Sequence, residues 1–285
     1  MKITKPLLIC PIDGLIASEV GAWAKEKHEY LRRYIHVSSG VRKQWLKDGS
    51  QSNKPKAGAT YIDLFCGSGR SKVKDKDEWI DGSPIVAWKA SQLSNAPFSQ
   101  IYIADSDKDN LEACKTRLEK LGAPVIAYNC DAKDALQICG GILNPHGLHF
   151  SFIDPFNLKS LDFKILESLS ELKRIDMLIH LSKMDLQRNL VKNLKDFESD
   201  FDAFVPGWRE VFDTNQGLKH VRQQVTDFWI KKVQALGVST SKHTDWKLIT
   251  GKNKQPLYWL MLIAKHQLAH QFWEAAAAEK QEKLF

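Results

Sequence analysis

The feature that most limits the fold of this chain is a regular alternation of short apolar segments with amphipathic ones between residues 60 and 181. The amphipathic segments have helical spacing, and the first opens with Ser83-Pro84, a favourable helix start. Strands that alternate with helices form a parallel sheet covered on both faces. The predicted strands are Thr60–Phe65, Gln100–Ala104, Pro124–Tyr128, Leu148–Ile153 and Ile175–Leu181.

The segments on either side of this core have different patterns. Before it, Val20–Leu46 has the spacing of a helix, and residues 48–58 have the polar composition of a linker. After a basic and aromatic helical stretch, two more strands, Asp245–Thr250 and Leu257–Ala264, precede a C-terminal helix. We therefore predict an α/β, Rossmann-like fold with a mostly parallel sheet of about seven strands. Its expected parts are an N-terminal helical arm and linker (1–58), the core (59–182), a helical insertion (183–243), and closing strands with a helix (244–285).

Composition narrows the possible partners. No apolar run approaches the ~20 residues that cross a bilayer, and the first residues lack a signal-peptide cleavage site, so no membrane partner is expected. The five cysteines form no CxxC pair and are odd in number, which argues against a zinc site or a disulfide framework. We expect free thiols, no metal and a cytoplasmic location. The formal net charge of +7 favours a polyanionic partner, because basic side chains displace counterions from phosphates.

A glycine-rich loop, Asp63-Leu-Phe-Cys-Gly-Ser-Gly69, follows the first predicted strand. Gly67 and Gly69 would let the backbone turn sharply and approach a nucleotide-like ligand at the carboxyl ends of the strands. We assign this loop, including Phe65 and Cys66, to a cofactor site, where Phe65 could pack on an adenosine. Asp63 could receive a cofactor amino group. A tight strand–helix turn without a ligand would have the same local sequence.

Acidic residues also follow the next two predicted strands. Asp105 is placed to accept both hydroxyls of a ribose, whereas Asp107 is better suited to cap the following helix. The long spacing from the glycine loop comes from a charged insertion, residues 72–82, which we interpret as a solvated loop in preference to a lid. Asp131 could contact an adenine amino group or cap the next helix, and these two roles are compatible.

The motif Asp154-Pro-Phe-Asn follows the fourth predicted strand and carries the candidate chemistry. An exocyclic amine is a poor nucleophile, because its lone pair is delocalised into the ring. Oxygen atoms of Asp154 and of the Pro155 carbonyl could accept its hydrogens, while Phe156 stacks a base that has left its duplex. Asn157 could assist either role. A simple Asp-Pro turn at a strand end is the alternative, and the three preceding strand-end motifs favour function.

Three further segments have two interpretations each. Lys27-His28 and His180 could serve as acid or base, although packing or surface positions are the more common explanation. Residues 219–232 interleave basic and aromatic side chains, which suits nucleic-acid contact but is also typical of an ordinary amphipathic helix. The candidate nucleic-acid-binding residues are Lys27, His28, Arg222 and Lys231.

Taken in order, DLFCGSGR, IYIADSD, NCDA and FIDPFN resemble the motifs of class I methyltransferases across residues 60–182. More closely, the chain resembles the three-Cys-motif partner proteins, the TcmP family. The resemblance implies S-adenosyl-L-methionine as cofactor and a possible partner protein with a three-cysteine motif. Its residues are the helix Trp23–Tyr34 with Lys27-His28, YIDLFCGSGR, Gly82-Ser83-Pro84, FIDPFNL and LYWLMLIAKH.

Three functions remain open at this point. The leading hypothesis is methyl transfer to an exocyclic amino group of a DNA or RNA base, for which the Asp-Pro-Phe sequence resembles the amino-methyltransferase motif with Phe156 in place of its second proline. The rival is a protein that binds the cofactor and regulates or recruits an iron–sulfur or phage-type partner without transfer activity. A methyltransferase for small molecules or proteins is the third, and it explains the Asp-Pro-Phe motif and the basic charge less well.

Overall fold

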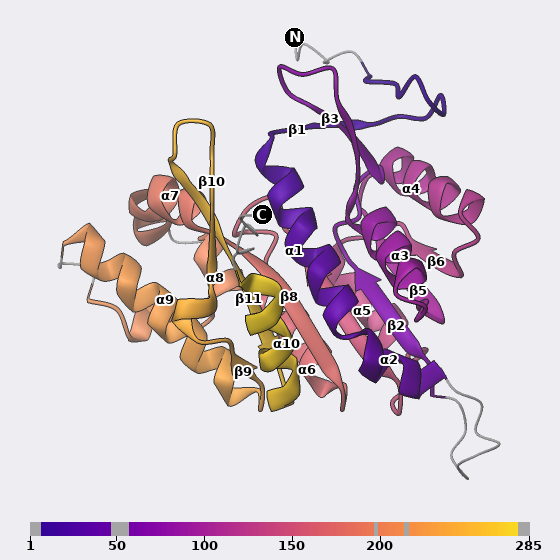
Figure 1. Cartoon of the computed structure of the whole chain (residues 1–285). Helices are drawn as coiled ribbons and strands as arrows, with labels where there is room; N and C mark the ends of the chain where they lie inside the picture. The colour runs from indigo at the N-terminus through magenta and orange to yellow at the C-terminus, as the bar shows by residue number, and fades with distance from the viewer. Residues whose placement is uncertain (1–6, 47–56, 197–198, 214–216, 279–285) are drawn as a thin grey trace, which may run out of the picture.

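The computed structural model describes residues 7–46, 57–196, 199–213 and 217–278, and a mixed sheet runs through its centre (Figure 1). The strand order is β6, β5, β2, β7, β8, β11, β10, with the short β9 paired to the end of β11. All neighbours from β6 to β8 are parallel, while β11 is antiparallel to both β8 and β10. The bounds are β2 Ala59–Asp63, β5 Gln100–Ala104, β6 Val125–Tyr128, β7 Leu148–Ile153, β8 Ile175–Ser182, β9 Ser239–Thr240, β10 Lys247–Thr250 and β11 Pro256–Ala264.

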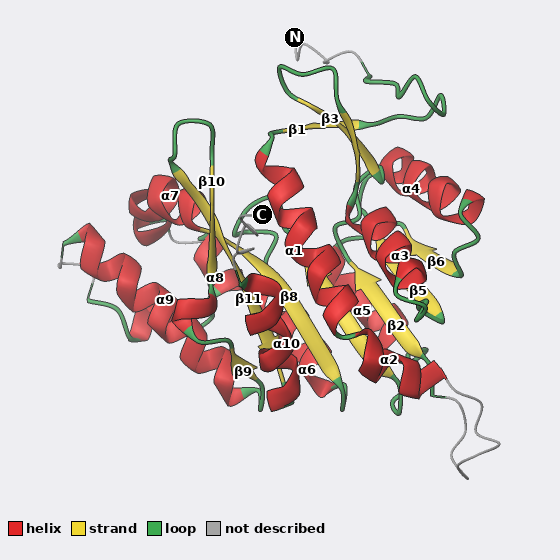
Figure 2. Ribbon diagram, viewed as in Figure 1, coloured by secondary structure: helices red, strands yellow, loops and turns green. Residues whose placement is uncertain are grey.

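Helices cover both faces of this sheet (Figure 2). One face carries α1 (Trp23–Val37), α2 (Ser39–Leu46), α3 (Ser83–Leu93), α4 (Lys108–Lys120) and α10 (Gln267–Ala277). The other carries α5 (Ala132–Gly140), α6 (Phe163–Glu171), α7 (Lys183–Lys195), α8 (Asp200–Phe204) and α9 (Leu218–Ala235), with the short 3-10 helices Trp208–Glu210 and His243–Asp245 in the connections.

The central strands of the sheet divide their side chains between two apolar cores. In β8, Leu178 packs in the core beneath α1 and α10, whereas Met177 and Ile179 pack in the opposite core beneath α6 and α7. Successive strand residues point to opposite faces, so strands buried on both sides need continuous apolar sequence. This requirement explains why near-unbroken apolar segments of the sequence predict these strands correctly.

The predicted fold class is confirmed, with two local corrections. The predicted N-terminal helix is interrupted by a turn at Ser38 and forms α1 and α2. The insertion that we interpreted as a solvated loop is instead a β-hairpin of β3 (Arg70–Val73) and β4 (Trp79–Asp81). β3 also pairs in parallel with β1 (Ser18–Val20), about 50 residues earlier, and a local sequence pattern carries no information about such a distant partner.

Several expectations from the sequence concern residues inside or outside the ranges that the structure describes. Most of the predicted linker, 48–58, lies outside the described residues, as do residues 1–6. Among the described cysteine side chains, Cys10, Cys66, Cys114 and Cys130 are free thiols. In the described ranges, no helix is both long enough and apolar enough to span a bilayer.

The order in which strands are added to the sheet reverses direction at β2. The chain proceeds outward from β2 to β5 and β6, and then returns to β7 on the opposite side of β2. Ligands of open α/β sheets bind at such a reversal, beyond the carboxyl ends of the two central strands. The glycine-rich loop follows β2 and the Asp-Pro-Phe motif follows β7, so both motifs occupy this position.

Candidate cofactor and acceptor site

The glycine-rich loop turns through two left-handed residues after β2. Gly67 has φ +55° and Gly69 has φ +77°, a region that side chains with a Cβ rarely adopt. A Cβ at Gly69 would lie 3.0 Å from Cys114 Sγ, so this glycine is required by packing. A Cβ at Gly67 would meet nothing within 4 Å, so the space beside this residue is open to a ligand.

Asp105, at the end of β5, is joined directly to this loop. Its carboxylate accepts hydrogen bonds from the backbone N–H of Gly67, at 2.9 Å, and from that of Asp107, at 2.9 Å. Burial raises the pKa of this carboxyl, and the two N–H groups oppose the rise. Each oxygen retains a second lone pair, and the side chain is only partly buried. A ribose diol offers two adjacent hydroxyl donors, so this arrangement fits the sugar of a nucleoside cofactor.

Asp63 lies beneath the loop, where it is fully buried. Its carboxylate accepts from the Tyr61 hydroxyl at 3.0 Å, the Phe65 N–H at 3.2 Å and the side chain of Ser83. Burial raises its pKa to about 6 against the effect of these donors. A contact between Asp63 and a cofactor amino group, as predicted from the sequence, would require one of these partners to move.

The other predicted cofactor residues surround the same two strand ends. Phe65 is half-buried against the core on the α5 side, and the Cys66 side chain is buried, with its backbone N–H donating to the Ala104 carbonyl at 3.1 Å. Asp131 is exposed, and its carbonyl accepts from the N–H groups at the start of α5. Asp107 caps α4 through its side chain, which confirms the predicted cap.

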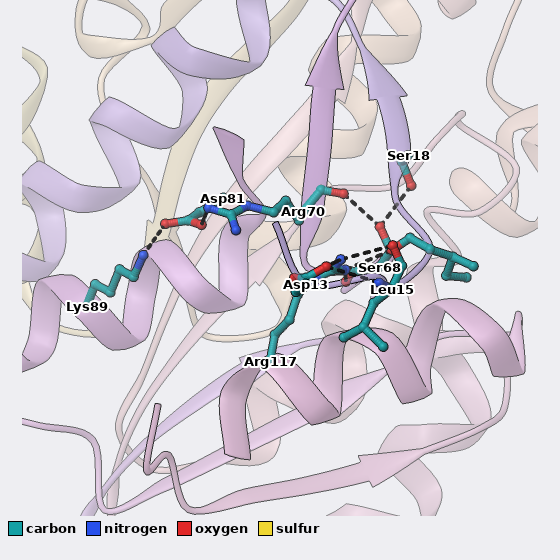
Figure 3. A network of polar contacts seen from close by, with 9 residues as sticks. Asp13, Leu15, Ser18, Ser68, Arg70, Asp81, Lys89 and Arg117 are labelled. Atoms are coloured by element: carbon teal, nitrogen blue, oxygen red, sulfur yellow. Dashed lines mark hydrogen bonds and ion pairs between the residues drawn. The ribbon is translucent and has the colours of Figure 1, made fainter. Parts of the chain in front are cut away.

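An N-terminal segment supports the glycine loop through Arg117 of α4 (Figure 3). This almost fully buried guanidinium binds both carboxylate oxygens of Asp13, with Nε–Oδ2 2.7 Å and Nη2–Oδ1 2.8 Å. It also donates to the carbonyls of Ile16, at 2.9 Å, and Ser68, which lies between the two loop glycines. The Arg117 hydrogen bond lowers the pKa of Asp13 to about 2. Nothing in the local sequence around Asp13 or Arg117 indicated this contact.

Asp154 follows β7 and is held by two side chains from other elements. Lys27 of α1 forms an ion pair with one carboxylate oxygen, and His180 Nδ1 of β8 lies 2.7 Å from the other. Burial opposes ionisation of Asp154, but Lys27 and His180 outweigh it and hold the pKa below its usual range. Asp63 pairs in register with Phe152, two residues before Asp154, so the two carboxylates belong to adjacent strand ends.

The remaining residues of the motif form a fixed turn with one exposed ring. Pro155 is buried, and Asn157 Oδ1 accepts from both the N–H and the hydroxyl of Ser160, at 2.9 Å each. The next N–H, that of Leu158, donates to Asp185 of α7 at 2.7 Å. Phe156 is 94% exposed beside these anchored residues. A large ring held open to solvent on a fixed loop is suited to stacking.

The predicted nucleic-acid-binding residues do not gather in one place. The ammonium of Lys27 is engaged by Asp154, and burial lowers the pKa of His28 to about 3, so neither offers a free positive charge to phosphate. Lys231 is exposed near the end of α9, and this helix leads into β9. β9 pairs with the part of β11 that lies beside the amino-terminal end of β8. Arg222 lies about 13 Å earlier on the same helix. The structure therefore places Lys27 beside Asp154 and Lys231 away from it.

Comparisons with known proteins give distant similarities only. No protein-family model matches the chain, and no curated protein matches it. Among solved structures, protein LPL1258 from Legionella pneumophila is 10% identical over 87% of this chain and 90% of its own, with a TM-score of 0.47. P. horikoshii TYW2 in complex with MeSAdo is 8% identical over 92% and 73%, with a TM-score of 0.44. An rRNA methylase from Streptococcus thermophilus is 10% identical over 82% and 96%, with a TM-score of 0.38.

Similarities this distant carry no argument about cofactor or substrate. The architecture is nevertheless defined by the strand order and by the antiparallel strand β11, independently of these comparisons. The chain has the Rossmann-like fold of class I methyltransferases.

Proposed function

We propose that this chain is an S-adenosyl-L-methionine-dependent methyltransferase whose acceptor is an exocyclic amino group of a nucleic-acid base. The observation that carries the proposal is the meeting of two motifs at the switch point of the sheet. The open loop at Gly67, joined to Asp105, lies beyond β2 and β5, and the anchored turn with Asp154 and Phe156 lies beyond β7. A donor and an acceptor could therefore meet across two adjacent strand ends.

The cofactor would supply a methyl group on a sulfonium centre. Asp105 would hold the ribose hydroxyls, the glycine loop would admit the nucleoside, and Phe65 and Asp131 would contact the adenine. Gly67 suits this role because a side chain there would fill the open space and strain the turn. The chain's own contribution to rate would be mainly to position the acceptor nitrogen in line with the methyl carbon.

On the acceptor side, Phe156 would stack on a base that has left its duplex or single-strand stack. The Pro155 carbonyl and Asp154 would receive hydrogen bonds from the amino group. The formal net charge of +7 supports a nucleic-acid substrate, DNA or RNA, through phosphate contacts, and Arg222 remains a candidate for such contacts. The resemblance to the TcmP family adds a three-cysteine-motif protein as a possible partner.

A second candidate function follows from the state of Asp154. Both of its oxygens already have a charged or hydrogen-bonding partner, which an amino group would have to share or displace. This observation favours a protein that binds S-adenosyl-L-methionine and serves a three-cysteine-motif partner without transfer activity of its own.

The two candidates are separated by binding and transfer measurements on the same protein. We expect calorimetry to detect S-adenosyl-L-methionine binding, and a tritium-methyl assay on total DNA and RNA to detect transfer. Asp154→Ala should abolish transfer and leave cofactor affinity nearly unchanged. Asp227→Ala, which removes an exposed aspartate of α9, is the matched control. Binding without labelling of nucleic acid would support the second function, and equal losses in both assays would reassign Asp154 to cofactor binding.

A further inference from the structure

Two buried polar atoms at the acceptor end have no hydrogen-bond partner among the residues that the structure describes: Nε2 of His180 and the hydroxyl of Tyr258. They belong to the paired strands β8 and β11, and their ring centroids lie 3.7 Å apart. Buried polar atoms of native proteins are nearly always hydrogen-bonded. An adjacent pair of exceptions, at the end of the site that carries Asp154, indicates atoms reserved for a substrate.

The contact with Asp154 determines which nitrogen of His180 carries the proton. Nδ1 lies 2.7 Å from an ionised carboxylate oxygen, so Nδ1 must be the donor in this pair. Burial lowers the pKa of His180, and the nearby Lys27 lowers it further, against the opposing effect of Asp154. A neutral imidazole with its proton on Nδ1 has an unprotonated Nε2. His180 Nε2 can therefore accept a hydrogen bond or a proton.

The charges around His180 suit it to receive a proton. Lys27 of α1 neutralises Asp154, and His28 on the same helix is kept uncharged by burial. The Tyr258 ring packs against the imidazole, and its buried hydroxyl has a raised pKa, so it too is uncharged. Asp154 and exposed Glu26 add to this rise, and the Lys27 ammonium lies 5.9 Å from the centroid of the Tyr258 ring. A proton that reached Nε2 would convert the Asp154–His180 hydrogen bond into an ion pair.

We propose that His180 is the proton acceptor of the reaction, with Nε2 facing the attacking amino nitrogen and with Asp154 and Lys27 as positioning residues; this inference rests on the proposed function. The nitrogen lone pair forms the new bond to the methyl carbon as the carbon–sulfur bond breaks, and that bond's electron pair stays on sulfur. The proton of the nitrogen passes to Nε2 and then to solvent. Asp154 thus acts through His180, in place of receiving the amino hydrogens itself, and need not release Lys27.

The test variant is His180→Asn, because an asparagine amide can replace the Nδ1 donor to Asp154 but has no atom at the place of Nε2. General-base contributions are typically about 100- to 10,000-fold, so we expect at least about a 100-fold loss of kcat, with cofactor affinity retained. The matched control is His149→Gln, which alters a buried histidine of β7 that lies at the amino-terminal end of the sheet and contacts the Asn144 carbonyl. This control should transfer methyl groups at the wild-type rate.

Two further readouts distinguish a proton acceptor from a structural residue. The wild-type rate should fall as the pH decreases through the lowered pKa of His180, and this acidic limb should be absent from the residual rate of His180→Asn. In ¹⁵N-histidine NMR spectra at neutral pH, the signal that disappears in His180→Asn should be that of an Nδ1–H tautomer with bare Nε2.

Each outcome decides between the alternatives. A protonated Nε2 in the NMR spectrum, or a His180→Asn protein with the wild-type rate and pH profile, would overturn the role of His180 and leave the methyltransferase proposal intact. Cofactor binding without transfer by the wild-type protein would remove the proposed function and the role of His180 together. Loss of the acidic limb with retained cofactor binding would support the inference.

Discussion

The contact between Asp13 and Arg117 allows a quantitative test of how the glycine loop is supported. The perturbation is Asp13→Asn, which preserves the shape of the side chain and removes its charge. The pKa of Asp13 is lowered from 3.8 to about 2 by the Arg117 hydrogen bond, against a rise from burial. At about 1.4 kcal/mol for each pH unit, the ionised contact contributes roughly 2 kcal/mol to the free energy of unfolding at neutral pH.

The sign of the pH dependence follows from the direction of this pKa change. Because the folded-state pKa lies below the unfolded one, the contribution is complete above the unfolded value of 3.8 and disappears as the pH falls through about 2. Asp13→Asn should therefore cost about 2 kcal/mol at pH 7 and progressively less in acid. Arg117→Met should cost more, about 3–5 kcal/mol, because it leaves a poorly exposed carboxylate without its cation.

The assay is urea denaturation of the two single variants and the double variant, followed by tryptophan fluorescence at pH 7. We expect a coupling energy of about 2 kcal/mol between the two positions. Calorimetry on the same proteins should show weaker S-adenosyl-L-methionine binding, because Arg117 also holds the Ser68 carbonyl of the loop. A coupling energy below about 0.5 kcal/mol would refute the conclusion that this pair fastens the N-terminal segment.

Two substitutions test the two ends of the site separately. Asp105→Asn should weaken S-adenosyl-L-methionine binding by about tenfold to 100-fold in calorimetry, because the amide replaces one of the two acceptor oxygens with a donor NH₂ group. Asp107→Asn, which can still cap α4, is its control, and equal effects would contradict the assignment. Phe156→Ala should raise the KM for nucleic acid by about tenfold to 100-fold, and the thermal midpoint should not change because the ring is 94% exposed. Phe156→Tyr should have the wild-type KM. An unchanged KM in the alanine variant would argue against base stacking.

The sequence by itself determined the sheet and the edge of the sheet at which the candidate site residues lie. Strands buried on both faces are mostly apolar, so segments such as Leu148–Ile153 could be read directly, and this strand has the predicted bounds. The carboxyl ends of parallel strands meet at one edge, so residues that follow different strands must gather there. The neighbourhood of Gly67 and Asp105 followed from those two facts, and it is joined by a hydrogen bond in the structure.

Only the tertiary structure decided the environment of each side chain at the carboxyl edge of the sheet. Lys27 and Asp154 are 127 residues apart, and their ion pair depends on how α1 packs across β7 and β11, where the Lys27 ammonium lies over the Phe152 and Tyr258 rings. The same is true of Asp13, which lies in a turn and whose partner Arg117 belongs to α4, 104 residues later. Secondary-structure periodicity specifies which face of an element is apolar, but not which distant polar group will lie opposite. Burial and charge pairing are sums over such distant neighbours, and they make Lys27 a largely buried ion-pair partner of Asp154 instead of a surface lysine.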